Sequence, residues 1–168
     1  YIDILKNYKD FQAAIFMGNA FAHLNDWEKV FSAVSNSLKP KGALAIFQII
    51  NFEKVFKIKK RFLDSNFAKS KTGVVQEHAF LEFYSPPTRK GGPLTLTMAI
   101  LDFDGKKWRP RSINSAAIAP LGVKEMDKIL RKYGFRKISF YGSVFWGPLF
   151  KDKFDPMQSD WLNVVARR

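Results

Sequence analysis

Three residues that follow the first apolar run of the sequence could contact a bound ligand. The run is Phe11–Met17. Gly18 and Asn19 follow it directly, and His23 comes shortly after them. Gly18 would let a ligand approach the backbone closely. Asn19 offers both a donor and an acceptor, and His23 can change between these roles near neutral pH. The alternative interpretation is a simple turn at Gly18 and Asn19, followed by a histidine with only structural hydrogen bonds.

Other kinds of reactive centre receive little support from the composition. The 168 residues include no cysteine, which excludes disulfides and thiolate zinc sites and is compatible with a cytoplasmic location. The two histidines, His23 and His78, are far apart in the sequence and have no carboxylate cluster around them. We therefore expect no metal site.

The loop after Phe11–Met17 needs a framework that presents it to a ligand. Phe11–Met17 and Ala43–Ile50 have the length and apolar character of strands that are buried on both faces, as in a parallel sheet. Between them, Asn25 and Glu28 form a capping-box pattern at the start of a helix. A strand, a helix and a second strand with short loops predict a right-handed parallel crossover, and so an α/β fold. Ligands of such sheets bind at the carboxyl ends of the strands, where this loop begins.

The middle of the chain has a different pattern. Residues 75–84, 94–103 and 108–119 are expected to be extended, with a tight turn at Asp104-Gly105 between the last two. We expect an antiparallel meander of three strands at about residues 74–120, inserted into the α/β framework.

The framework resumes after this insertion. Residues 123–133 have the spacing of an amphipathic helix, and Gly134 stands where a left-handed cap is expected. Residues 136–143 and 161–166 are expected to form two more strands. The whole chain, 1–168, is therefore expected to be one α/β domain that carries an insertion.

Several segments, taken in order, resemble the glycine N-methyltransferase-like branch of class I S-adenosylmethionine-dependent methyltransferases. The resemblance covers nearly the whole chain. It implies a Rossmann-like sheet of which this chain carries strands four to seven, the C-terminal portion. The segments are Met17–Trp27, Leu38–Gly42, Gln48–Phe52, Lys132–Phe135, Ile138–Gly142 and Trp161–Arg168.

The resemblance also implies a set of residues that bind S-adenosylmethionine. Asp3 and Ile4 resemble the acidic and apolar pair whose carboxylate and backbone N–H face the adenine ring. Beside the methionine moiety and the ribose, the family pattern places Met17, Gly18, Ala20 and His23.

The methyl acceptor implied by the resemblance is a small molecule, and an amine in particular. The residues expected on its side are Asn19, Asn51, Arg61, Tyr84 and Tyr141. For Arg61 a surface charge is the favoured interpretation, and Tyr84 could equally be a core residue. No catalytic acid or base is expected. The acceptor displaces the methyl group directly from the sulfonium of the cofactor, and the leaving group is a neutral thioether.

The sequence departs from the family pattern in ways that bear on cofactor binding. The glycine-rich loop after the first strand and the acidic residue that ends the second strand do not occur in it. Gln12 stands where the family usually has Asp, and Lys41 where Gly is common. Without three further strands, Phe11–Met17 would form an open apolar edge. We therefore expect upstream sequence or a partner chain to complete the sheet.

The charge of the chain leaves two other functions open. The formal net charge is +13, which would attract polyanions, so an RNA methyltransferase is one alternative. The basic residues are spread along the sequence, however, and Lys57–Arg61 is the nearest to a cluster. The other alternative is a degenerate methyltransferase-like subunit that binds without turnover. No apolar stretch reaches the length of a membrane span, so we expect a soluble protein.

Overall fold

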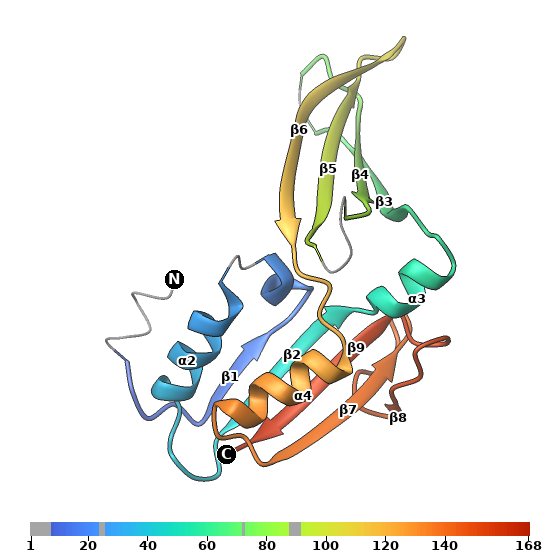
Figure 1. Ribbon diagram of the computed structural model, residues 1–168. Helices are drawn as coiled ribbons and strands as arrows, with labels where there is room; N and C mark the ends of the chain where they lie inside the picture. Colours follow the sequence, from blue (N-terminus) through green and yellow to red (C-terminus); the bar gives the residue numbers. More distant parts are fainter. Residues whose placement is uncertain (1–7, 24–25, 72, 88–91) are drawn as a thin grey trace. The chain divides into compact units, whose positions relative to one another are not determined.

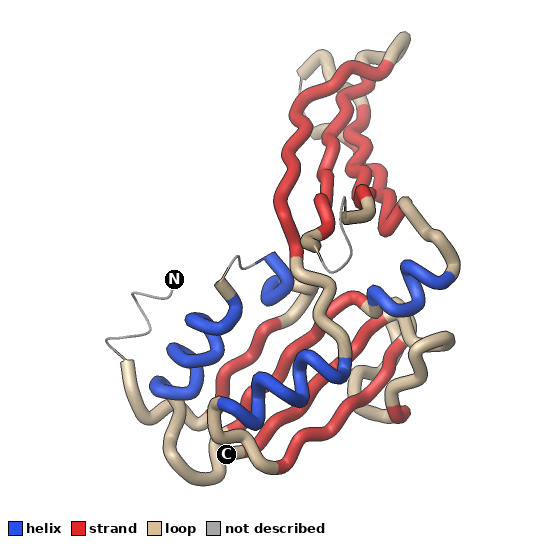
Figure 2. Tube along the Cα trace, viewed as in Figure 1, coloured by secondary structure: helices blue, strands red, loops and turns tan. Residues whose placement is uncertain are grey.

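The computed structural model describes residues 8–23, 26–71, 73–87 and 92–168. Asp3 and Ile4 lie outside the described residues. The chain divides into two compact units: one is formed by the residues up to Ile58 together with Pro120–Arg168, and the other by Lys59–Ala119. Figures 1 and 2 show their helices and strands.

The first unit is built on a five-stranded sheet in the order β1-β2-β9-β7-β8. β1 and β2 are parallel, and β9 is antiparallel to both β2 and β7. β1, β2 and β7 therefore point the same way, and their carboxyl ends lie at one edge of the sheet. This arrangement confirms the predicted parallel crossover. The strands are β1 (Ala13–Phe16), β2 (Leu44–Ile50), β7 (Lys137–Ser143), β8 (Asp152–Lys153) and β9 (Trp161–Arg167).

Two helices cover one face of this sheet, α2 (Trp27–Ser37) and α4 (Val123–Lys132), as Figure 1 shows. The Ser35 hydroxyl joins them by donating to the Tyr133 carbonyl over 2.8 Å. Beneath α2, the fully buried rings of Phe21, Phe31 and Phe47 pack with centroids 4.6 to 5.3 Å apart. The apolar faces of the two helices and of β2 therefore form the core of this unit.

The starts and ends of the two helices follow local chemistry. Asp26 caps α2, because its side chain accepts from the Lys29 N–H over 3.1 Å. The expected cap, Asn25, lies outside the described residues, and a neighbouring carboxylate takes the role. Gly134 follows α4 with φ +88°, which confirms the predicted left-handed cap.

β1 differs from the strand that the sequence predicts. It was expected to be buried on both faces, but it is the edge strand of the sheet, and the Ile15 side chain is 61% exposed. Among the described residues β1 pairs with β2 alone, and α2 covers one of its faces, so an apolar sequence is not enough to bury it. Within the part of the chain that the structure describes, β1 is therefore an edge strand with exposed apolar side chains.

The second unit is an antiparallel sheet of four strands in the order β3-β4-β5-β6. The predicted number of three was wrong, and the unit begins at Lys59 rather than near residue 74, because β3 was not foreseen. β3 is mostly exposed and carries polar residues among its apolar ones, which hides its strand pattern. The turn at Gly105, with φ +89°, lies where it was predicted. The strands are β3 (Phe62–Lys69), β4 (Glu77–Ser85), β5 (Leu94–Phe103) and β6 (Trp108–Ile118).

Two short helices lie at the carboxyl edge of the first unit's sheet. The 3-10 helix η1 (Ala20–His23) follows β1, and α3 (Phe52–Lys57) follows β2. Within the described ranges, no helix is both long and apolar enough to cross a membrane.

Candidate functional site

The loop between β1 and η1 is held in place by β2. Gly18 and Asn19 both have φ +63°, a conformation that glycine and asparagine adopt more readily than other residues. The Gly18 N–H donates to the Gln48 side-chain oxygen over 2.9 Å, and the Asn19 N–H donates to the Gln48 carbonyl over 3.1 Å. Gln48 therefore fixes the loop at the carboxyl edge of the sheet. These two N–H groups already have partners within the protein.

Asn19 itself is buried, with 3% of its surface exposed. Its side-chain oxygen accepts from the Ile50 N–H over 3.2 Å. Among the described residues, its side-chain nitrogen has no hydrogen-bond partner. Buried donors are nearly always satisfied, so this nitrogen is a candidate to donate to a bound group.

The residues on either side of Asn19 lie at the surface. Met17, Gly18 and Ala20 are exposed. A Cβ placed on Gly18 would meet no atom within 4 Å, so the space beside its backbone is open to a ligand. His23 is the last residue of η1.

Asn51, expected on the acceptor side, has a structural role at the same edge. Its side-chain oxygen caps α3 by accepting from the Lys54 N–H over 3.2 Å. Its amide nitrogen donates to the carbonyls of Pro156 and Ser159 over 3.1 and 2.8 Å. These bonds leave little of the amide for a ligand, although Asn51 also lines a cavity.

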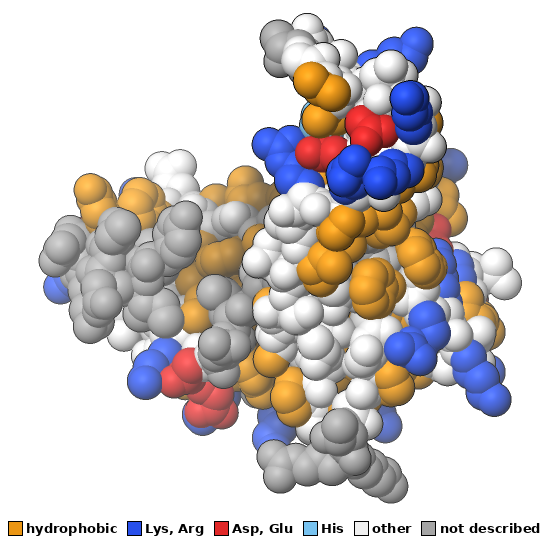
Figure 3. Space-filling view, turned by 90° about the horizontal axis from the view of Figure 1, so that it is seen from above, with side chains coloured by type: hydrophobic (Ala, Val, Ile, Leu, Met, Phe, Trp, Pro, Cys, Tyr) orange, Lys and Arg blue, Asp and Glu red, His pale blue; other side chains and the backbone are white. Residues whose placement is uncertain are grey.

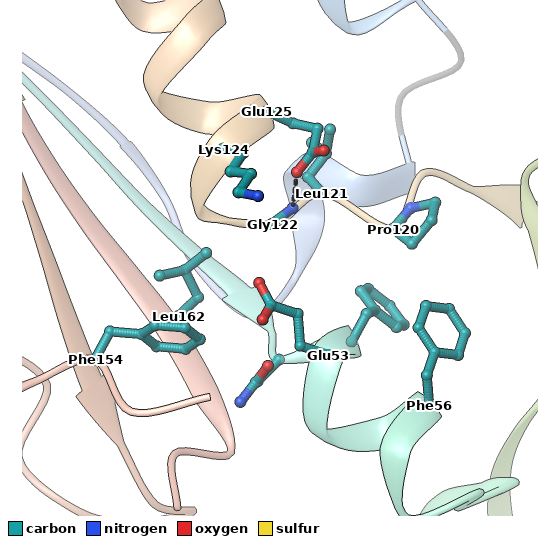
Figure 4. A pocket seen from close by; sticks show the side chains of 11 residues that line it. Glu53, Phe56, Pro120, Leu121, Gly122, Lys124, Glu125, Phe154 and Leu162 are labelled. Carbon is teal, nitrogen blue, oxygen red and sulfur yellow. Dashed lines mark hydrogen bonds between the residues drawn. The ribbon is translucent and has the colours of Figure 1, made fainter. Parts of the chain in front are cut away.

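That cavity lies where β2 ends, between α3 and the start of α4 (Figure 4). It has a volume of about 340 Å³ and includes no residue of the loop from Met17 to His23. Its lining residues are Asn51, Phe52, Glu53, Phe56, Pro120, Leu121, Gly122, Lys124, Glu125, Phe154 and Leu162.

Asp160 organises the same edge, although its role was not predicted from the sequence. Its carboxylate forms a 2.8 Å ion pair with Lys54 of α3 and accepts from the Phe145 N–H over 3.1 Å. Its backbone donates to the Ser143 carbonyl and accepts from the Asn51 N–H, both over 2.9 Å. One residue therefore joins the ends of β2 and β7. No local signal would have identified Asp160, whereas Gln48 could have been noticed as a lone polar residue within an apolar strand.

The other predicted acceptor-side residues lie in two places. Tyr141 of β7 stands opposite Asn163 of β9, which stands opposite Gln48 of β2, so all three side chains share one face of the sheet. Arg61 and Tyr84 belong to the second unit, where the Arg61 guanidinium donates to the Tyr84 carbonyl over 2.8 Å. Burial raises the pKa of the Tyr84 phenol, and the Arg61 charge partly opposes that rise.

Figure 3 shows lysine and arginine side chains at several separate places, with hydrophobic side chains exposed between them. Several cations are paired, for example Lys132 with Glu28 over 2.8 Å and Arg131 with Asp127 over 2.8 Å. In the part of the chain that the structure describes, no group of His, Cys, Asp or Glu could hold a metal ion.

Comparison of the fold with solved structures gives clear likenesses. DesVI from Streptomyces venezuelae has a TM-score of 0.63 and 13% identity, over 95% of this chain and 60% of that one. The CcbJ methyltransferase from Streptomyces caelestis has a TM-score of 0.59 and 14% identity, over 95% of this chain and 61% of that one. The sugar N-methyltransferase KedS8 from a Streptoalloteichus species has a TM-score of 0.59 and 10% identity, over 95% of this chain and 57% of that one.

The likeness establishes a mixed α/β fold similar to those of methyltransferase structures. This chain spans only 57% to 61% of the length of those proteins. No protein-family model and no curated protein matches the sequence.

Proposed function

We propose that the protein is an S-adenosylmethionine-dependent methyltransferase with a small-molecule acceptor, and that the acceptor is an amine. The observation that carries the proposal is the loop from Gly18 to Asn19 at the carboxyl edge of a parallel strand pair, where open α/β sheets bind ligands. The similarity in fold to two proteins described as methyltransferases supports it, and the N-methyltransferase KedS8 supports the choice of a nitrogen acceptor.

The loop residues fit one wall of a cofactor site. Met17, Gly18 and Ala20 present an exposed backbone with open space beside Gly18, and we assign them with His23 to the methionine moiety and the ribose. Asn19, with its unsatisfied buried nitrogen, and Asn51 are assigned to the acceptor side. Arg61, Tyr84 and Tyr141 are further acceptor-side assignments, and Asp3 and Ile4 are assigned to the adenine ring.

Methyl transfer requires little acid or base catalysis from these residues. When bound, the cofactor supplies a methyl group on a sulfonium. The task of this chain is to hold the acceptor in line and to exclude water. The loop suits this task because Gln48 fixes its backbone before any ligand binds.

The finer assignment is the glycine N-methyltransferase-like branch, with β1, β2, β7 and β9 as strands four, five, six and seven. It rests on the sequence segments that begin at Met17 and on the parallel pairing of β1 with β2. We further propose that upstream sequence or a partner chain completes the sheet beside β1. The exposed edge at Ile15 supports this.

Calorimetry with S-adenosylmethionine tests the function, and two glycines give a matched pair. Gly18 and Gly42 both have positive φ, and both have nothing within 4 Å of an added Cβ. They differ in place, because Gly42 precedes the start of β2, whereas Gly18 is bonded to Gln48 near its end. Gly18→Leu and Gly42→Leu should therefore be similarly strained. We expect only Gly18→Leu to weaken cofactor binding, by at least about tenfold, or roughly 1.4 kcal/mol.

The outcomes separate the competing functions. Equal affinities of the two variants would contradict the assignment of the loop. Cofactor binding without methyl transfer to any of a panel of amines would favour a degenerate binding subunit. Methyl transfer to RNA, with affinity that falls steeply with salt, would favour an RNA methyltransferase.

A further inference from the structure

The cavity at the end of β2 combines aromatic walls with carboxylates. Phe52 and Phe56 of α3 have ring centroids 6.2 Å apart, and Phe154 and Leu162 line the cavity as well. The charged lining residues are Glu53, Lys124 and Glu125, and all three side chains are exposed. Two negative charges therefore face one positive charge beside an aromatic surface.

Gly122 keeps a small space open between the two carboxylates. A Cβ on Gly122 would lie 3.1 Å from Glu53 Oε1 and 3.1 Å from Glu125 Oε2. Figure 4 shows the Glu53 carboxylate pointing from α3 toward Gly122, while Glu125 accepts from the Gly122 N–H over 3.1 Å. Like charges so near one point repel, and a cation placed there would relieve the repulsion.

The two glutamates differ in what they do for the fold. Glu125 caps α4 through its bond to Gly122. Glu53 lies in the first turn of α3 and, within the described residues, its side chain has no hydrogen-bond or ion-pair partner. Helix capping therefore accounts for one carboxylate but does not account for the direction of the other.

We propose that this cavity binds an organic ammonium ion, a protonated amine on a small apolar body. Carboxylates and the faces of aromatic rings both attract such a cation, and the walls contact its apolar part. The volume of about 340 Å³ is within the range of small-molecule sites. A bare metal ion fits less well, because it prefers several oxygen ligands to phenylalanine rings.

This inference rests on the proposed function, because it takes the ligand of this cavity to be the methyl acceptor. The carboxylates stabilise the protonated form of the amine, which has no lone pair to receive a methyl group. The nitrogen bound here is therefore a recognition group, and the nitrogen that is methylated is a different one. The acceptor class is then a molecule with two nitrogens, one of which stays charged.

The experiment compares benzylammonium with neutral benzyl alcohol, which has nearly the same shape, by calorimetry at neutral pH without cofactor. We expect benzylammonium to bind saturably and more tightly, and its advantage to shrink as salt is added. Glu53→Gln and Glu125→Gln should each weaken benzylammonium binding roughly two- to fivefold, as expected for exposed ion pairs. The side-chain amide oxygen in Glu125→Gln can still accept from the Gly122 N–H, so α4 keeps its cap.

Lys124→Ala gives a result that misfolding could not imitate. Removal of this ammonium should strengthen benzylammonium binding, while benzyl alcohol should be unaffected. Asp10→Asn is the matched control, because Asp10 is exposed before β1 and does not line this cavity. It should leave both probes unchanged.

Three results would overturn the proposal. They are equal affinities of the two probes, no saturable binding of benzylammonium, and affinities that Glu53→Gln and Lys124→Ala leave unchanged. In each of these cases, the carboxylates have no role in holding a cation. Because no cofactor is present, such a failure leaves the methyltransferase proposal to be decided separately by cofactor binding to the Gly18 and Gly42 variants.

Discussion

Single polar residues within apolar segments control the geometry of the candidate site. Gln48 interrupts an otherwise apolar β2, yet both its side-chain oxygen and its carbonyl hold the loop at Gly18 and Asn19. Asn19 in turn binds the end of β2 through Ile50. Buried amides of this kind specify one arrangement, because each misplaced partner would leave a polar group unsatisfied.

Gln48→Met should loosen the loop while it preserves the length of the side chain. The Gly18 N–H would lose its acceptor, so we expect a loss of about 1 kcal/mol in the free energy of unfolding. Hydrogen exchange of the Gly18 amide should become faster. Gln12→Met, at an exposed position before β1, is the control and should change neither quantity. Unchanged exchange at Gly18 in Gln48→Met would show that Gln48 does not hold the loop.

Asp104 gives the second unit a dependence on pH. Backbone hydrogen bonds from Lys107 and Lys106, and then the Arg109 side chain, lower the pKa of its carboxyl from 3.8 to about 2. Because the folded pKa is the lower one, the charged group stabilises the fold above the unfolded value. That contribution is lost as the pH falls through 3.8 toward about 2.

Asp104→Asn should therefore make the melting temperature less dependent on pH in that acidic interval. The variant should be less stable than the parent at neutral pH, and the difference should shrink as the pH falls. Asp152→Asn, on the exposed β8, serves for comparison and should follow the parent. An identical acid limb in Asp104→Asn would mean that the turn does not hold this carboxylate.

At the scale of elements, the ends of strands and helices are joined by contacts that are remote in sequence. Asp160 connects α3 with the turn that begins at Val144, where the Gly147 N–H donates to the Val144 carbonyl over 3.0 Å. Because β2 and β7 end at the same edge, this residue sets the spacing of the two loops beside the candidate site.

Asp160→Ala should destabilise this edge more than an ordinary surface substitution. The Lys54 ammonium and the Phe145 N–H would both lose a charged, partly buried partner, so we expect a loss of about 2 kcal/mol in the free energy of unfolding. Amide exchange at Phe145 should become faster. Asp127→Ala removes an exposed ion pair on α4 and should cost far less. Losses of equal size would argue against a special role for Asp160.

At the scale of the whole molecule, the outer edge of β1 is a candidate surface for self-association. Phe11 is 42% exposed and Ile15 is 61% exposed, and among the described residues β1 has a partner strand on one side only. Edge strands of this kind pair readily with other chains. A sheet completed by further strands would bury these residues.

Ile15→Lys should reduce self-association by placing a charge on this edge. Light scattering during concentration or heating should show a later onset of aggregation than in the parent. Gln12→Lys adds the same charge just outside β1 and controls for net charge. If both variants aggregate like the parent, β1 is not the surface through which the chains associate.

The sequence by itself determined the local and periodic features of this protein. The crossover of β1, α2 and β2 follows from two apolar runs and an amphipathic segment, and the glycines at 105 and 134 mark a turn and a cap. The position of the Gly18–His23 loop at the carboxyl edge followed from the parallel pairing. The turn and the cap depend on interactions between near neighbours, which short patterns record. The crossover follows from the general preference of strand–helix–strand units for a parallel, right-handed connection.

Only the tertiary structure decided what depends on distant partners. Gly18 meets Gln48 thirty residues away in the chain, and Lys54 meets Asp160 at a separation of 106 residues. β3 becomes a strand because β4 pairs with it, and the exposure of β1 depends on what lies beside it. The cavity at Gly122 likewise combines three segments of the chain. No local pattern encodes such pairings, because their free energy exists only once the sheet and helices have packed.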